Sequence, residues 1–210
     1  MPATPNLTQD QLDGTPIRTI AFPAAGLIFA ATQNQVWRFD QMGSTWTCTP
    51  IPTTNLPSTL IITALAVEDP SAGSFYVTVG GGGVDHVWYY DGKSWQSAGL
   101  SVSIVDAPAH AVAVDPASPK YVYVGIDVGC WRGTKFSEGN WARTLFSQGL
   151  PESTITDLGI HMQARLLRAA THGRGVWEIR LDDTSGSDPD LYLRANYADS
   201  GRLQGGSRFP

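Results

Sequence analysis

The sequence predicts an all-β fold, and three observations support this. One short pattern recurs four times, its apolar residues alternate with a period of two, and a tryptophan follows each copy at the same place. A period of two sets alternate side chains on opposite faces of a strand. The 22 glycines and 14 prolines agree with many short strands joined by tight turns. At 210 residues, one repetitive domain can use most of the chain.

The first strand of each repeat alternates large and small side chains. In the copy that starts at Ile62, Leu65 is large and both of its neighbours are alanines. A strand with one large and one small face suits sheets that stack closely around an axis. The expected first strands are residues 17–22, 62–67, 109–114 and 155–160, and the expected second strands are 27–31, 75–79, 121–125 and 166–170.

The third strand of each repeat begins with a small or branched residue followed by tryptophan. These tryptophans stand roughly 40 to 50 residues apart, the length of a four-stranded propeller blade. A second tryptophan opens a fourth strand in the first three repeats. The third-strand tryptophans are Trp37, Trp88, Trp131 and Trp177, and the fourth-strand ones are Trp46, Trp95 and Trp141.

We therefore predict β-propeller blades, complete or as an incomplete propeller, in four repeats of three to four antiparallel strands. The third-strand tryptophans should occupy equivalent positions. If their rings are buried, replacing one by alanine is expected to cost about 3–5 kcal/mol. The repeats span about 17–52, 62–100, 109–150 and 155–181.

Composition argues against several partners. The net charge is −5 and the 14 Lys and Arg form no basic run, so no nucleic-acid partner is expected. No apolar stretch approaches membrane-spanning length and the first residues lack a secretion-signal pattern, so no membrane insertion is expected. The four histidines lack metal-ligand spacing, and neither a metal nor another cofactor is predicted. For Cys48 and Cys130, two buried free thiols are favoured over a disulfide.

Three phrases resemble the Asp-box (BNR) family of sialidase-like and sortilin-like β-propellers. Residues 113–125 resemble the turn between the first two strands of that family, and residues 149–158 and 170–177 resemble its last blade. The resemblance covers about residues 17–181. It implies the propeller fold, and it implies no single function because such folds serve many roles.

The Asp boxes themselves are degenerate. In the resembled family the box runs Ser-x-Asp-x-Gly-x-Thr-Trp, a hairpin turn whose aspartate bonds backbone amides. Here the box at Asp40 has one residue too many, the box at Asp91 has one too few, and residues 137–141 lack the aspartate. The resemblance implies that these turns are structural.

The end of the chain departs from the repeat. Residues 1–181 are assigned to the repeats, 182–189 to a polar linker, and 190–210 to an irregular tail that resembles the start of a further β-domain. The fourth repeat lacks a fourth strand, and a bare edge strand invites aggregation. Residues 6–8 would cover this edge in a closed four-blade ring, and Tyr192 with its neighbours would cover it in an incomplete one. Because propellers of the resembled family usually have more than four blades, we favour an open or partner-completed arrangement.

Sialidase-type catalysis is not expected. As the resemblance implies, it needs three arginines that grip a carboxylate, and the arginines here do not recur at equivalent places. Other glycoside hydrolases need two carboxylates about 5–10 Å apart. The loops that join second to third strands and those that join repeats should share one edge, where the weak catalytic candidates are Asp85, Asp106, Asp127 and Glu152. We favour the simpler interpretation that these are turn residues capping backbone amides.

The segment Thr171-His-Gly-Arg-Gly175 is the most distinctive candidate for binding. Its glycines permit a sharp turn that would expose His172 and Arg174 at the same edge. Asp127 and His86 complete the predicted binding set. The sequence thus predicts a non-catalytic recognition or scaffold module of a bacterial secreted, cell-envelope or multiprotein assembly, with protein subunits or a glycan as partner. The alternative is a glycoside hydrolase, sialidase-like or of β-glucan type, or a fragment of one.

Overall fold

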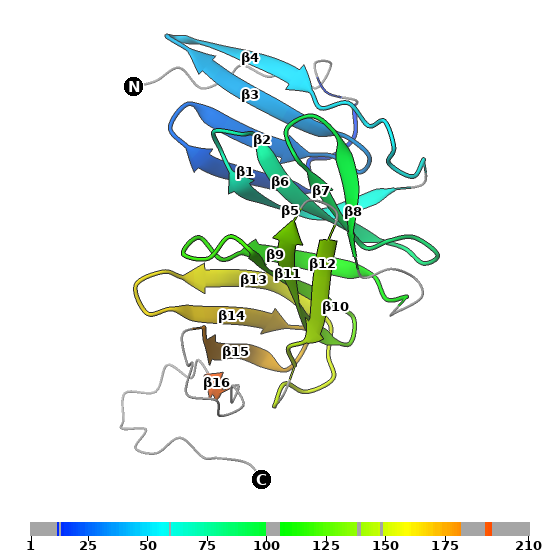
Figure 1. Ribbon diagram of the computed structural model, residues 1–210, viewed down its shortest axis with the longest axis vertical. Helices are drawn as coiled ribbons and strands as arrows, with labels where there is room; N and C mark the ends of the chain where they lie inside the picture. Colours follow the sequence, from blue (N-terminus) through cyan, green and yellow to red (C-terminus); the bar gives the residue numbers. More distant parts are fainter. Residues whose placement is uncertain are drawn as a thin grey trace.

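The chain folds into four antiparallel sheets of four strands each (Figure 1). The computed structural model describes residues 12, 14–58, 60–99, 106–137, 140–147, 149–181 and 192–194, and these residues contain no helix. The prediction of an all-β fold is therefore confirmed. In each sheet the strands are hydrogen-bonded in chain order, so each sheet is a meander.

We number the sheets along the chain. Sheet 1 contains β1 (Thr19–Ala24), β2 (Leu27–Ala31), β3 (Val36–Met42) and β4 (Thr45–Pro50). Sheet 2 contains β5 (Ile61–Asp69), β6 (Ser74–Gly80), β7 (Val87–Tyr90) and β8 (Trp95–Gly99). Sheet 3 contains β9 (Ala109–Val114), β10 (Tyr121–Ile126), β11 (Gly129–Ser137) and β12 (Asn140–Leu145). Sheet 4 contains β13 (Ile155–His161), β14 (Leu166–Thr171), β15 (Gly175–Arg180) and β16 (Tyr192–Arg194).

The four sheets share one register, which confirms the predicted repeat. In sheet 2, Trp88 pairs with Val77, and Val77 pairs with Leu65. The same row, from an aliphatic residue on the first strand to tryptophan on the third, crosses every sheet, and we call it the tryptophan row. The other three rows are Ile20–Ala30–Trp37, Val112–Val124–Trp131 and Leu158–Ala169–Trp177.

The rings of the four tryptophans in these rows are half-buried. The loss of about 3–5 kcal/mol expected for a fully buried ring therefore does not apply to them. Replacing one by alanine should cost about 1–2 kcal/mol, because only part of the ring leaves water on folding. Trp88 and Trp177 also donate an indole hydrogen bond to a backbone carbonyl three residues earlier, at 2.9 and 3.0 Å. These two variants should lose more than Trp37→Ala. Urea denaturation of the four single variants checks this, and equal losses above about 4 kcal/mol would contradict half-burial.

The core lies between successive sheets, because the sheet faces that meet there are apolar. The tryptophan row faces the preceding sheet: Leu65 and Val77 pack in one cluster with Phe29 of sheet 1. A second row, which we call the small–aromatic row, faces the following sheet: Tyr76 packs in one cluster with Val112 of sheet 3. The small–aromatic rows of the first three sheets are Ala21–Phe29–Arg38, Ala66–Tyr76–Tyr89 and Ala113–Tyr123–Arg132.

Ion pairs reinforce the two later interfaces. Lys135 of β11 donates to Glu68 of β5 at 3.2 Å, and the hydroxyl of Tyr89 donates to the same carboxylate at 2.5 Å. Arg165, in the turn before β14, donates to both carboxylate oxygens of Asp115 at 2.8 and 2.7 Å. Each pair joins two sheets, so each sets how neighbouring sheets are placed.

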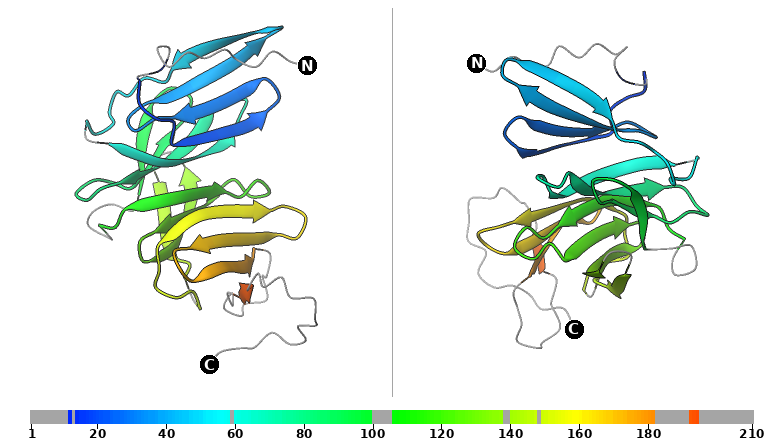
Figure 2. Two further views of the ribbon diagram at one scale, coloured as in Figure 1. Left: turned by 180° about the vertical axis from the view of Figure 1, so that it is seen from behind. Right: turned by 45° about the horizontal axis from the view of Figure 1, so that its top comes forward.

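The sheets are arranged in series and not as a closed ring. The first strands pack in the order β1, β5, β9 and β13. Sheets 1 and 4 lie at opposite ends of the molecule in Figure 1 and in the left view of Figure 2. The described residues therefore form an open stack.

The fourth strand of sheet 4 is supplied by the C-terminal tail. Tyr192–Arg194 form β16, which pairs antiparallel with residues 176–178 of β15. This is the pairing expected for the incomplete arrangement, and it places a short strand in a tail that was expected to be irregular. The rival segment, residues 6–8, and the linker 182–189 lie outside the described residues.

Candidate functional site

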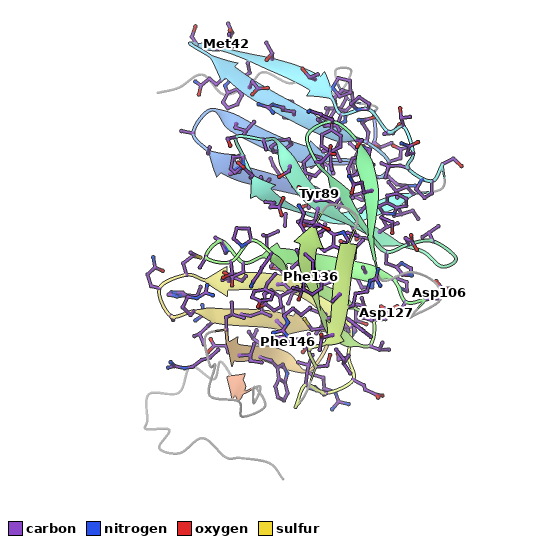
Figure 3. The ribbon with its side chains drawn as sticks, viewed as in Figure 1. Met42, Tyr89, Asp106, Asp127, Phe136 and Phe146 are labelled. Carbon is purple, nitrogen blue, oxygen red and sulfur yellow. The ribbon has the colours of Figure 1, made fainter. Side chains whose placement is uncertain are left out.

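One side of the molecule, which we call the loop edge, gathers the turns between second and third strands and the connections between sheets. The amide of Gly83, in the β6–β7 turn, donates to Asp106, in the connection to sheet 3, at 2.8 Å. The amide of His172, in the β14–β15 turn, donates to the carbonyl of Thr154, in the connection to sheet 4, at 2.8 Å. These bonds confirm that the two kinds of loop meet. Figure 3 labels Asp106 and Asp127 on this side.

Asp106 ties the connection between sheets 2 and 3 to the preceding turn. Besides the Gly83 amide, its Oδ1 lies 3.2 Å from Nε2 of His86, whose Nδ1 lies 3.2 Å from the carbonyl oxygen of Val79. The His86 side chain is completely buried. Its imidazole therefore cannot reach a ligand, and the binding role predicted for His86 does not fit this position.

Asp127 makes the equivalent tie between sheets 3 and 4. Its Oδ1 lies 2.7 Å from Nε2 of His110 and accepts a bond of 3.4 Å from the hydroxyl of Thr154. A hydroxyl nucleophile is activated by a hydrogen bond to the histidine of a triad. Here the hydroxyl bonds to the carboxylate, so the three groups form a structural cross-link between two loops.

Sequence reasoning missed His110, although the repeat carries a signal for it. The second position of the aligned first-strand segments is polar in every repeat. In sheet 2 this position is Thr63, whose hydroxyl donates to the carbonyl of Ala109 in sheet 3 at 2.6 Å. The position thus supplies polar links at the loop edge. Its four occupants are Arg18, Thr63, His110 and Thr156.

The two remaining catalytic candidates also lie apart from a shared pocket. Asp85 accepts a bond of 2.5 Å from the hydroxyl of Ser97, and Glu152 is exposed on the connection to sheet 4. A small, partly open pocket does lie between sheets 2 and 3, but none of the four candidate carboxylates lines it. Its walls are mostly apolar and include Val87, Ala98, Val124, Trp131, Trp141 and Arg143.

The carboxyl groups with clearly displaced pKa values are displaced downwards. Hydrogen bonds from Ser71 hold the pKa of Asp69 below its usual value. Burial acts to raise the pKa of Asp91, but bonds from the amides of Ser94 and Lys93 outweigh it and lower the pKa. A general acid of a glycoside hydrolase needs the opposite displacement.

Asp91 lies in the second of the segments that resemble an Asp box. Its Oδ1 accepts the backbone N–H groups of Lys93 at 2.7 Å and Ser94 at 2.6 Å within the β7–β8 turn. The aspartate thus caps backbone amides even though the turn is one residue short. Asp40 of the first box instead pairs with Arg38 at 2.8 Å.

The turn between β14 and β15 has the geometry that its glycines predict. Gly173 and Gly175 have φ values of +76° and +81°, in the left-handed region that favours glycine. His172 and Arg174 are both exposed. Their side chains are accessible polar groups at the loop edge, next to the exposed Glu152.

Other kinds of site receive no support from the described part of the chain. It holds no group of three or more His, Cys, Asp or Glu side chains that could bind a metal ion. It also has no helix with the length and apolarity to cross a membrane. Cys48 and Cys130 are free, but only Cys130 is buried, and this burial raises the pKa of its thiol to about 12.

Comparison with known proteins identifies the fold and not a family. No family model and no curated protein matches the sequence. Similar solved structures include the extracellular domain named as a hybrid two-component system of Bacteroides thetaiotaomicron, with 15% identity and a TM-score of 0.58. An extracellular domain named as a one-component system of the same species has 16% identity and a TM-score of 0.58. A protein of unknown function from that species has 15% identity and a TM-score of 0.59.

These matches cover 86%, 85% and 84% of this chain, but only 22%, 22% and 42% of the matched chains. The chain therefore spans less than half the length of these structures. At such low identity the likeness concerns the fold alone, and 427 solved chains match in this comparison.

Proposed function

We propose that the chain is a non-catalytic recognition or scaffold module, an incomplete β-propeller of Asp-box type within a larger bacterial secreted or envelope assembly. One observation carries the proposal: two acidic side chains of the loop edge bond to neighbouring loops. Asp106 holds the β6–β7 turn, and Asp127 holds the connection to sheet 4. Carboxylates used in this way fix the loops of a binding surface, and their bonds to the protein compete with a role as acid or base in hydrolysis.

The surface fixed by these ties would contact protein or glycan. His172, Arg174 and Glu152 are its accessible charged or polar groups, on a turn and a connection joined by the bond from the Ser153 hydroxyl to the His172 carbonyl at 2.9 Å. Exposed polar groups on rigid loops suit recognition of hydroxyl and carboxylate groups. Two of the similar structures are extracellular domains, which is compatible with such a role.

The purified chain is expected not to hydrolyse sialosides, xyloglucan or other β-glucans. The physical reason is that a hydrolase needs two carboxylates facing one substrate, and the candidates here face separate partners. Release of free sialic acid or of reducing ends, at mildly acidic and neutral pH, measures this. Turnover that vanishes in Asp127→Ala and persists in Asp69→Ala, an exposed control outside the loop edge, would contradict the proposal.

A further inference from the structure

The outer face of sheet 1 carries a tryptophan row with no sheet against it among the described residues. Ile20 is 49% exposed, whereas its counterparts Leu65, Val112 and Leu158 are each 8% exposed. Phe22, two residues further along β1, is 68% exposed. The repeat thus supplies a direct comparison at the first strand: this residue of the row is buried wherever a sheet precedes it and exposed where none does, whereas Ala30 is buried and Trp37 is half-buried like its counterparts.

The three internal interfaces show what such a row accepts. The tryptophan row of each later sheet packs against a small–aromatic row, in which an alanine stands beside Phe29, Tyr76 or Tyr123. These three rings are almost completely buried. The complementary surface is therefore a β-sheet that presents a small residue next to an aromatic ring.

The free face of sheet 4 does not meet this description. Gly159 takes the place of the alanine, but Arg168 takes the place of the ring, and Arg168 donates to Glu178 beside it at 2.6 Å. Burying a charged pair against an apolar face is costly. A polar outer face is also typical of the last unit in a repeat stack. Head-to-tail association of two copies of this chain is thereby disfavoured.

We propose that the outer face of sheet 1 binds a β-sheet from outside residues 1–210 that presents a small residue beside an aromatic ring. This rests on the proposed role within a larger assembly and names the class of partner. Sheet 1 extends over 32 residues, from Thr19 to Pro50, and the 18 residues before Thr19 in this sequence are too few for such a sheet. The partner sheet therefore comes from outside residues 1–210.

The test converts the free face of sheet 4 into the missing partner. The double variant Arg168→Tyr with Glu178→Arg gives sheet 4 the order of sheet 3, where Tyr123 and Arg132 follow Ala113. Its sheet 4 then serves as a probe for sheet 1 of a second molecule. By analytical ultracentrifugation the unaltered chain should be monomeric, and the double variant should associate to at least twice the monomer mass.

Two added substitutions show which surface is used. Phe22→Asp in the double variant should restore the monomer, and Phe136→Asp, at an equally exposed phenylalanine of β11, should leave association intact. Circular dichroism confirms that each variant is folded. A folded double variant that stays monomeric would overturn the proposal, as would an unaltered chain that dimerises through Phe22, since a second copy would then be the occupant. Hydrolytic activity, which tests the proposed function, affects neither result.

Discussion

Replacing Phe75 by alanine is expected to lower the free energy of unfolding by about 3–5 kcal/mol. The ring is completely buried between sheets 1 and 2, with its centroid 5.2 Å from those of Phe29 and Tyr90 and 5.4 Å from that of Trp95. Truncation removes apolar contact on every side and leaves a cavity that β-strands on both sides cannot readily close. The midpoint and slope of urea denaturation measure the loss.

The matched control is the same substitution at Phe22. Its ring is mostly exposed on the outer face of sheet 1, so Phe22→Ala should change stability by no more than about 0.5 kcal/mol. If both variants lose the same amount, either sheet 1 does not stack on sheet 2 as described or its outer face is covered in the isolated chain. A large loss at Phe75 alone supports the open stack.

Replacing Asp115 by asparagine is expected to cost about 2–3 kcal/mol at neutral pH. The carboxylate is buried and receives two bonds from Arg165, and removing its charge takes away the ion pair that these two bonds form. The cost falls below the roughly 3–5 kcal/mol of a fully buried pair because Arg165 is partly exposed. Urea denaturation of the variant and the unaltered chain at neutral pH gives the difference.

The same pair makes stability depend on pH. Bonds from Arg165 lower the pKa of Asp115, against the opposing effect of burial. A carboxyl group whose pKa is lower in the folded state contributes stability above its unfolded pKa, about 4, and loses it as the pH falls through the folded value. The difference between the chain and Asp115→Asn should therefore shrink below about pH 4. Asp69→Asn, an exposed control whose carboxylate serves only its own turn, should show a smaller difference, and a constant Asp115 difference down to strong acid would contradict this account.

The repeat and its register could be predicted because they depend on local pattern. Alternation of Leu65 with alanines identifies a strand, and a tryptophan at blade spacing aligns one sheet with the next. The extent of burial could not be predicted in the same way. Trp88 is half-buried. The exposed fraction of its ring depends on how closely the neighbouring sheets approach at their third strands, and the sequence of one repeat does not specify that distance.

In the candidate site, too, local features could be predicted from the sequence and contacts between distant segments could not. The exposed turn at His172 follows from two glycines within four residues, so a local signal was sufficient. The partners of Asp106 and Asp127 are 17 to 27 residues away along the chain, and no local pattern indicates which side chains these loops bring together. The burial of His86 also depends on which distant loops come together around it, so it could not be predicted from local sequence.

The most direct test of the open stack is a nuclear Overhauser measurement on the methyl and aromatic protons of the intact chain. The account predicts cross-peaks between Phe29 and Phe75, and between Tyr76 and Trp141, because the ring centroids of these pairs lie 5.2 and 5.4 Å apart across neighbouring sheets. It predicts none between Ile20, on the outer face of sheet 1, and Val176, on the outer face of sheet 4. Cross-peaks between Ile20 and Val176 would place sheet 1 against sheet 4, close the ring, and contradict the open face on which the proposed partner docks.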